Sequence, residues 1–276
     1  MHRPRKRFGQ HFLAPSWAAK VVAAIDVQPG DVLLEIGPGQ GAITLPLAET
    51  GAPILAVEID RDLARDLATQ VPPNVSLVTA DFLQTDVVPY LTALQPSRPP
   101  GATDIPPRRF RAVGNLPYNL SSPILFRLID LRQQHALFAD ATLMVQREVA
   151  DRLVAKPGTR DYGVLSIFAQ LHADIRRVLD LPPTAFTPPP KVRSSVIRLD
   201  FRRSPVRIVD DALFARIVKG AFTQRRKTLV NALKPLEPTA PAVVALAGID
   251  SKRRPETLSI EDFARLTELF ATVRST

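Results

Sequence analysis

Residues 115–118 read Asn-Leu-Pro-Tyr and place an amide, a constrained carbonyl and an aromatic ring side by side. The exocyclic amine of adenine is a poor nucleophile because its lone pair is delocalised into the ring. The Asn115 oxygen and the Leu116 carbonyl could accept its N–H groups, and that carbonyl is aimed because the residue before a proline is held extended. Tyr118 offers a face for stacking an extruded base. The segment therefore suits activation of an adenine amine, although a proline turn with a core tyrosine would look the same.

A glycine-rich segment, Gly37-Pro38-Gly39-Gln40-Gly41, follows an apolar run and precedes a helical pattern. Glycines at such a turn let the backbone approach a ligand closely, and the following helix offers free N–H groups. The spacing differs from the Gly-x-Gly-x-x-Gly of most dinucleotide sites, and no Gly-Lys-Ser/Thr ending is present. The segment indicates a ligand-binding turn, with a plain tight turn as the alternative.

Two acidic residues follow the next two expected strands, Glu58 after the second and Asp81 after the third, where Phe82 comes next. A carboxylate at the first position can accept hydrogen bonds from ribose hydroxyls. One at the second position can accept from an adenine amino group. Either acid alone could be a helix cap, but together with the glycine turn they fit a ribose–adenine ligand.

The elements that must position these residues alternate along the first half of the chain. Strand-like segments are expected at 32–36, 54–57, 75–79, 111–113 and 141–145, and helical segments at 18–25, 42–49, 61–70 and 122–131. The segments 149–154 and 165–171 continue this alternation, and 192–201 is expected to be a terminal strand. Such alternation is typical of a parallel, doubly wound α/β sheet.

The pattern changes after about residue 206, where helices are expected at 211–223, 225–234, 241–247 and 260–273. Ser259 and Asp262 are spaced like a capping box that opens the last helix. We therefore expect two domains, an α/β domain at 1–204 and a small, basic all-α domain at 205–276. The proline-rich stretch 96–107 is expected to be an irregular loop.

The charge of the chain is concentrated at its two ends. The 276 residues carry 36 basic and 27 acidic side chains, a formal charge of +9, divided as +5 in 1–20, −4 in the middle and +8 in 191–276. Such asymmetry is typical of a protein with a polyanionic partner, most often nucleic acid, although a solvated surface is the alternative.

The absence of cysteine excludes a disulfide scaffold, a thiolate zinc site and a cysteine nucleophile. The four histidines are scattered, so no histidine metal site is expected. No window approaches the roughly 18 apolar residues of a membrane span, and no hydrophobic signal segment opens the chain. We expect a soluble, cytoplasmic protein that needs no metal.

Four stretches in register resemble the S-adenosylmethionine-dependent rRNA adenine dimethyltransferases: 5–13, 35–41, 115–118 and 186–192. The resemblance runs from about residue 3 to the C-terminus and is strongest to the small-subunit branch of that family. It implies a Rossmann-like methyltransferase sheet of seven strands with the last antiparallel. It also implies N6,N6-dimethylation of two adjacent adenosines near the 3′ end of small-subunit (16S) rRNA during subunit assembly, with S-adenosylmethionine as the methyl donor. Nothing in the sequence indicates an obligate partner, so we expect a monomer.

The resemblance assigns the donor site residue by residue. His11 and Leu13 would close over the methyl donor, and Gly37 and Gly39 would lie under its methionine part. Glu58 would hold the donor's ribose, and Asp81 and Phe82 would hold its adenine. Asn115 would contact the donor as well as the target adenine. The family often has Asn where His11 stands, which leaves the side-chain contact at that position open.

The resemblance also assigns the target site. Asn115, Leu116 and Pro117 would orient the target amine, and Tyr118 and Phe186 would stack the target base. RNA phosphates would be contacted by basic residues near the ends of the chain, namely Arg5, Lys6, Arg7, Lys191, Arg225, Arg226 and Lys227. The domain at 1–204 would then be catalytic and the domain at 205–276 would bind RNA.

Three other readings stay open. The macrolide-resistance branch modifies large-subunit rRNA on a similar scaffold, but Asn119, the 144–148 stretch and the triple proline at 188–190 favour the small-subunit branch. A ribosome-assembly factor that acts mainly by binding is the second alternative, and the intact Glu58, Asp81 and Asn115 argue against loss of activity. A dinucleotide-dependent oxidoreductase is the third, and no hydride-transfer acid supports it.

Overall fold

The computed structural model describes residues 11–94, 109–224 and 226–275. Arg5, Lys6, Arg7, Arg225 and the proline-rich loop at 96–107 lie outside the described residues. By its internal contacts the chain divides into two units, one of Met1–Ala150 with Asp174–Arg202 and one of Asp151–Ala173 with Arg203–Thr276. The sequence placed 151–173 in the first domain. The structure groups it with the second unit because Tyr162, Ile167 and Leu171 belong to that unit's apolar core.

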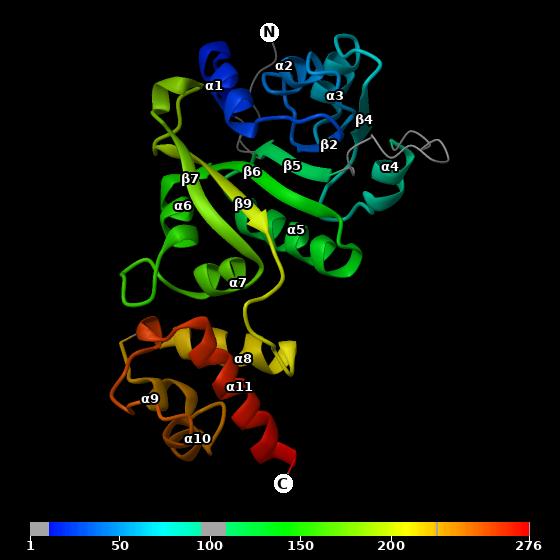
Figure 1. The fold of residues 1–276 in the computed structure, drawn as a ribbon. Coiled ribbons are helices and arrows are strands. Elements are labelled where there is room, and N and C mark those ends of the chain that lie inside the picture. The colour runs from blue at the N-terminus through cyan, green and yellow to red at the C-terminus, as the bar shows by residue number, and fades with distance from the viewer. Residues whose placement is uncertain (1–10, 95–108, 225, 276) are drawn as a thin grey trace. The chain divides into compact units, whose positions relative to one another are not determined.

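The first unit is built on a seven-stranded sheet in the order β4-β3-β2-β5-β6-β9-β7 (Figure 1). The strands β2 to β6 run parallel, and β9 runs antiparallel to β6, as the resemblance implied. Their bounds are Asp31–Ile36 (β2), Ile54–Glu58 (β3), Val75–Thr79 (β4), Arg109–Asn115 (β5), Phe138–Gln146 (β6), Ala173–Leu181 (β7) and Ser194–Phe201 (β9).

The parallel order brings the carboxyl ends of neighbouring strands to one edge of the sheet. Every residue of β2 and β3 is buried. Apart from Asp31 at the start of β2, both strands are apolar up to an acidic residue near the carboxyl end, Glu35 in β2 and Glu58 in β3. Gly114 stands near the end of β5, where a Cβ would lie 2.6 Å from the Ile36 carbonyl oxygen. The backbones of β2 and β5 therefore approach each other closely beside Asn115.

The sequence did not predict β7. Exposed and partly buried residues alternate along it because it is an edge strand, and charged residues such as Asp174, Arg176 and Asp180 occupy one face. A second, two-stranded sheet was also missed, in which β1 (Phe12–Leu13) pairs antiparallel with β8 (Phe186–Thr187) after a short 3-10 turn at Pro183–Ala185. Strands of two residues carry too little pattern to be predicted.

Except for the helix at Val88–Ala93, which the sequence analysis did not predict, the helices that join the strands follow the predicted alternation. They are α1 (Pro15–Ile25), α2 (Thr44–Ala48), α3 (Arg61–Ala68), α4 (Val88–Ala93), α5 (Ser121–His135), α6 (Arg147–Val154) and α7 (Val164–His172). The Asp60 side chain caps α3 by accepting from the Asp62 N–H at 3.1 Å. This cap follows directly on Glu58, so the start of α3 is fixed beside the end of β3.

A buried ion network ties the opposite end of the sheet together. Arg111 on β5 is fully buried, with its guanidinium 2.9 Å from Asp140 on β6 and 2.7 Å from Asp31 on β2. The same guanidinium donates to the carbonyls of Ile25 and Asp26 at the end of α1. One side chain therefore joins three strands to the helix that follows β1.

The second unit is helical, as predicted, with α8 (Asp211–Thr223), α9 (Leu229–Leu233), α10 (Ala240–Leu246) and α11 (Ile260–Ser275), besides a 3-10 turn at Pro255–Thr257. The capping box is confirmed, since Ser259 and Asp262 exchange side-chain to backbone bonds of 3.1 Å. The prediction of a helix at 225–234 was wrong about where the helix begins. Helix α9 begins at Leu229, because Arg226 and Lys227 lie in a turn and Thr228 is extended.

Within this unit Glu237 pairs with Arg216 and Arg274, which joins the segment after α9 to α8 and α11.

In the part of the chain that the structure describes, no helix is long and apolar enough to cross a membrane.

Candidate functional site

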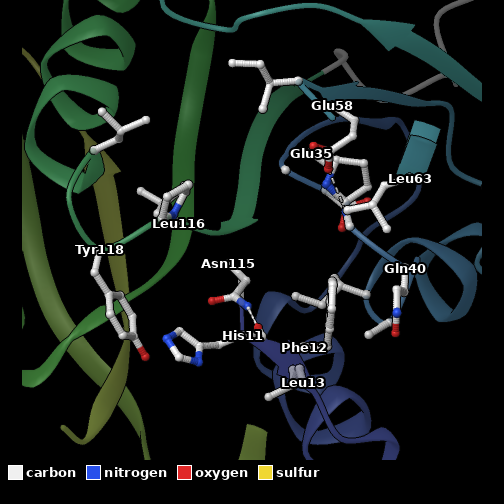
Figure 2. Close-up of a pocket in the computed structure, with 18 of the residues that line it drawn as sticks. His11, Phe12, Leu13, Glu35, Gln40, Glu58, Leu63, Asn115, Leu116 and Tyr118 are labelled. Carbon is white, nitrogen blue, oxygen red and sulfur yellow. Dashed lines mark hydrogen bonds between the residues drawn. The ribbon is translucent and has the colours of Figure 1, made fainter. Parts of the chain in front are cut away.

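A pocket opens at the carboxyl ends of β2, β3 and β5 (Figure 2). Of the residues predicted for the donor and target sites, nine line it: His11, Leu13, Gly37, Gly39, Glu58, Asn115, Leu116, Pro117 and Tyr118. These residues come from the segment before α1, the glycine turn and two strand ends. The topology therefore brings together most of the site that the sequence predicted.

The glycine turn has the backbone conformation that its sequence requires. Gly37 and Gly39 adopt φ values of +71° and +59°, in the left-handed region where residues with a Cβ are strained. The Gly39 N–H donates to Glu58 Oε2 at 2.9 Å, and the Asp60 N–H donates to Glu58 Oε1 at 2.8 Å. These bonds hold the Glu58 carboxylate against the turn, so that the acid and the glycines form one wall.

Glu35 is the main site residue that the sequence analysis missed. It is only 1% exposed, it lines the pocket, and its Oε2 has no hydrogen-bond partner among the described residues. Burial raises the pKa of Glu35 from 4.5 to about 7, and the negative charge of Glu58 adds to this rise. Burial also raises the pKa of Glu58. The signal was present in the sequence, since Glu35 is the one acid in the run 32–36.

The amide of Asn115 is oriented by its neighbour in the N-terminal segment. Its Nδ2 donates to the backbone oxygen of His11 at 3.0 Å, drawn as a dashed line in Figure 2. A carbonyl oxygen only accepts, so the amide group that faces His11 must be the NH2. The Asn115 Oδ1 is thereby left as the acceptor that faces elsewhere. Beside it the Leu116 N–H donates to the Met144 oxygen at 3.1 Å, which fixes the backbone that follows Asn115.

Tyr118 is held from one side by a hydrogen bond and covered on one face by a ring. Its hydroxyl lies 2.7 Å from Ser194 Oγ, and burial raises the pKa of this hydroxyl. The His11 ring stacks on the Tyr118 ring with centroids 5.5 Å apart and planes inclined by 25°. The Nδ1 of His11 donates to the Pro188 oxygen at 2.8 Å. Sequence analysis predicted none of these three contacts.

Three predicted site residues lie outside this pocket. Asp81 follows β4 at the same edge of the sheet as Glu58, and its side chain accepts a hydrogen bond from the Leu83 N–H at 2.9 Å. Neither Asp81 nor the buried Phe82 lines the pocket. Phe186 is 3% exposed and packs in the apolar core, paired through the backbone with Leu13. The structure therefore does not bring Phe186 to the place where a stacked base was expected.

The predicted RNA-binding residues are described only in part. Lys191 is exposed in the loop before β9, outside the pocket. Arg226 and Lys227 are exposed in the turn between α8 and α9, and they line a surface hollow with Phe222 and Gln224. Among the described residues, no group of three acidic or histidine side chains could hold a metal ion.

Comparisons with known proteins agree on one family. The profile of "Ribosomal RNA adenine dimethylase" matches residues 1–272. Two proteins named ribosomal RNA small subunit methyltransferase A, from Syntrophotalea carbinolica and Nitrosococcus oceani, are each 44% identical to this chain. The first alignment covers 97% of both sequences and the second covers 96% of both.

Two solved structures share the fold over nearly the whole chain. A dimethyladenosine transferase from Plasmodium falciparum superposes with a TM-score of 0.70 at 25% identity, over 95% of this chain and 98% of that one. The 23S rRNA methyltransferase ErmE superposes with a TM-score of 0.63 at 26% identity, over 94% and 99%. The shared architecture is thus common to a protein named as a dimethyladenosine transferase and one named as a 23S rRNA methyltransferase.

Proposed function

Because this chain belongs to the ribosomal RNA adenine dimethylase family, we propose that it transfers methyl groups to the N6 amines of two adjacent adenosines near the 3′ end of small-subunit (16S) rRNA. The observation that carries the proposal is the Asn115 amide, whose NH2 is held by the His11 carbonyl in a pocket shared with the glycine turn and Glu58. The reaction class is methyl transfer from S-adenosylmethionine.

The donor site fits S-adenosylmethionine in three respects. Glu58 is held at the glycine turn where a ribose can be bound, and Gly37 and Gly39 leave the turn without side chains at the pocket wall. The orphaned Glu35 Oε2 supplies a buried acceptor for the donor's ammonium group. Asp81 and Phe82, one strand further along the same edge, remain our candidates for the donor's adenine. The bound donor supplies an electrophilic methyl group carried on a sulfonium.

The acceptor residues activate the adenine amine by hydrogen bonding. Asn115 Oδ1 and the Leu116 carbonyl accept the two N–H groups of the amine in the first transfer, and one of the two acceptors binds the single remaining N–H in the second. These bonds favour a pyramidal nitrogen whose lone pair is available. Asn115 Oδ1 and the Leu116 carbonyl would hold this lone pair in line with the methyl carbon that a bound donor would supply. The methyl group would exchange its bond to sulfur for a bond to nitrogen, and the proton lost from the amine would leave to solvent. Catalysis rests on positioning, and no strong general base is needed. Tyr118 provides the ring on which the target base stacks.

The small-subunit branch is supported over the large-subunit branch by sequence similarity. The relatives named for the small subunit are 44% identical, whereas ErmE is 26% identical with a similar fold. We place the protein in the cytoplasm, as a monomer that acts on an assembling small subunit without a metal. The proposed contacts to RNA phosphates are Lys191, Arg226 and Lys227, together with Arg5, Lys6, Arg7 and Arg225.

A labelling experiment tests this function. Unmodified small ribosomal subunits are incubated with the protein and labelled S-adenosylmethionine, and the modified nucleotides are then mapped. Label in N6,N6-dimethyladenosine at two adjacent positions near the 3′ end is expected. Label in large-subunit RNA would select the other branch. Donor binding with no label in either RNA would leave an assembly factor that acts by binding.

A further inference from the structure

The face of Tyr118 that a target base would use is covered in this structure. The His11 imidazole stacks on the Tyr118 ring at 5.5 Å between centroids (Figure 2). Its Nδ1 donates a hydrogen bond to the Pro188 oxygen at 2.8 Å. Stacked aromatic pairs with centroids 4.5–7 Å apart contribute about 0.5–1.5 kcal/mol beyond the area that they bury. The imidazole is therefore held by two contacts at the place where the proposed reaction needs an adenine.

A base cannot enter between the two rings. Each stacked base occupies about 3.4 Å, so a base between His11 and Tyr118 would need the rings about 7 Å apart. The observed 5.5 Å is too short for that arrangement. Stacking of a base on this face of Tyr118 requires that one of the two rings leaves.

The contacts of the two residues indicate which ring moves. The Tyr118 hydroxyl is bonded to Ser194, a fully buried residue at the start of β9. Among the described residues, the His11 ring has one hydrogen bond, to the Pro188 carbonyl, and His11 stands just before the short strand β1. Rotation of the His11 side chain frees Tyr118 and leaves the His11 backbone oxygen on Asn115, so the amide stays oriented.

We propose that His11 is a specificity-determining residue whose imidazole competes with the target adenine for the Tyr118 ring. The inference rests on the proposed function. An adenine held in place by the surrounding RNA structure displaces the imidazole, because its other contacts offset the lost stacking. An adenine presented by a flexible, non-target RNA has no such contacts and is disfavoured. Because the imidazole opposes every base equally, it leaves the ratio of the two affinities unchanged and discriminates by occupancy: the target RNA still saturates the protein at concentrations at which the weaker non-target RNA no longer binds.

A binding measurement tests the competition directly. A short RNA hairpin that carries 2-aminopurine at the target position reports stacking by its fluorescence. We expect His11→Ala and His11→Asn to bind this hairpin about 2- to 10-fold more tightly than the wild type, because no imidazole stacking has to be broken first. His11→Phe keeps a ring on Tyr118 and should bind no more tightly than the wild type. His135→Ala, at an exposed histidine at the end of α5, is the matched control and should change nothing.

A double-mutant cycle shows whether the effect passes through Tyr118. In a Tyr118→Ala background, removal of the imidazole should give no further gain, because the shared ring is absent. Weaker or unchanged hairpin binding by His11→Ala and His11→Asn, with unchanged thermal unfolding, would overturn the proposal. This outcome differs from failure of the proposed function, which is read from the absence of methylated rRNA with wild-type protein.

A second readout follows methyl transfer. With small subunits at saturating concentration and a non-target, single-stranded RNA well below saturation, the ratio of non-target methylation to small-subunit methylation should rise in His11→Ala by a similar factor, because only the unsaturated reaction gains from tighter binding. A ratio equal to that of the wild type would count against the competition.

Discussion

The pocket depends on the orientation of single polar groups by their neighbours. The Asn115 amide is the clearest case, since the backbone carbonyl of His11, 104 positions away in the chain, decides which of the two polar atoms of the amide faces His11. The Glu58 carboxylate is fixed in the same way by the Gly39 and Asp60 N–H groups. The same side chains without these partners would have no defined direction.

Replacement of Asn115 tests its role in the transfer step. Asn115→Ala removes the acceptor oxygen, and methyl transfer should fall by on the order of 10²-fold or more. Donor binding, measured by calorimetry, should change little. Asn115→Asp keeps an oxygen but loses the NH2 that bonds the His11 carbonyl, and it should also lose activity. Full activity in Asn115→Asp would contradict the importance of this orientation.

Replacement of Glu35 tests the buried charge. The pKa of Glu35 is raised from 4.5 to about 7, so its protonated form is favoured by folding. Its ionisation therefore costs stability as pH rises from about 4.5 to about 7, and the cost is fully present above pH 7. Glu35→Gln cannot ionise, so its unfolding free energy relative to wild type should rise by about 2 to 3 kcal/mol between pH 5 and pH 8.

Urea unfolding of the two proteins without ligand gives this difference. A constant difference across that range would show that Glu35 is not buried as the structure has it.

Among the elements, the end of the sheet remote from the pocket is organised by one arginine. Arg111 joins β5, β6 and β2 to the last carbonyls of α1, and α1 follows directly on the segment that carries His11. A buried ion pair is weak evidence for net stability, but loss of one partner leaves the remaining charges uncompensated.

The element-scale prediction concerns this network. Arg111→Met should lower the unfolding free energy, because Asp31 and Asp140 lose their shared buried partner. The loss should be about 3 kcal/mol, the lower end of the usual range, because Arg198 still pairs with Asp140 and Arg109 still pairs with Asp31. Arg176→Met removes an exposed ion pair with Asp200 and is the control, with an expected change within about 0.5 kcal/mol. Denaturant midpoints of the two variants provide the comparison, and equal midpoints would contradict the expected difference.

Considered as a whole molecule, the chain carries the acidic residues of the pocket in its middle and most of its positive charge toward its two ends. The middle of the chain, with a charge of −4, contains Glu35 and Glu58, and the last 86 residues, 191–276, carry +8. A net positive charge favours association with RNA, and each phosphate that the protein neutralises adds to the salt dependence of binding.

Substitution of the exposed Arg226 and Lys227 tests the second unit as an RNA-binding surface. The double change to Gln should weaken binding to small-subunit RNA and reduce the slope of log K against log salt by about 0.7 to 0.9 for each phosphate that is no longer neutralised. Arg61→Gln with Arg65→Gln on α3 removes the same charge elsewhere and should leave binding less affected. Equally weakened binding in both pairs would indicate that only net charge matters.

Most of the fold could be predicted because it depends on local pattern. The strand 75–79 and the helix 211–223 have the predicted bounds, and the alternation of apolar strands and helices indicated the parallel sheet. The edge strand β7, the pairing of β1 with β8, and the grouping of 151–173 with the C-terminal helices were not predicted. Each of these depends on contacts between distant segments, which no local window contains.

The sequence by itself determined the family, the reaction class and the strand ends where Glu58, Asp81 and Asn115 stand, because motifs and periodicity are properties of neighbouring residues. Only the tertiary structure decided that Glu35 is buried with an unpaired oxygen, that Phe186 belongs to the core, and that His11 covers Tyr118 and orients Asn115. The physical reason is that burial and hydrogen bonding are set by groups that lie close in space, and those groups come from segments up to 177 positions apart, as His11 and Pro188 are.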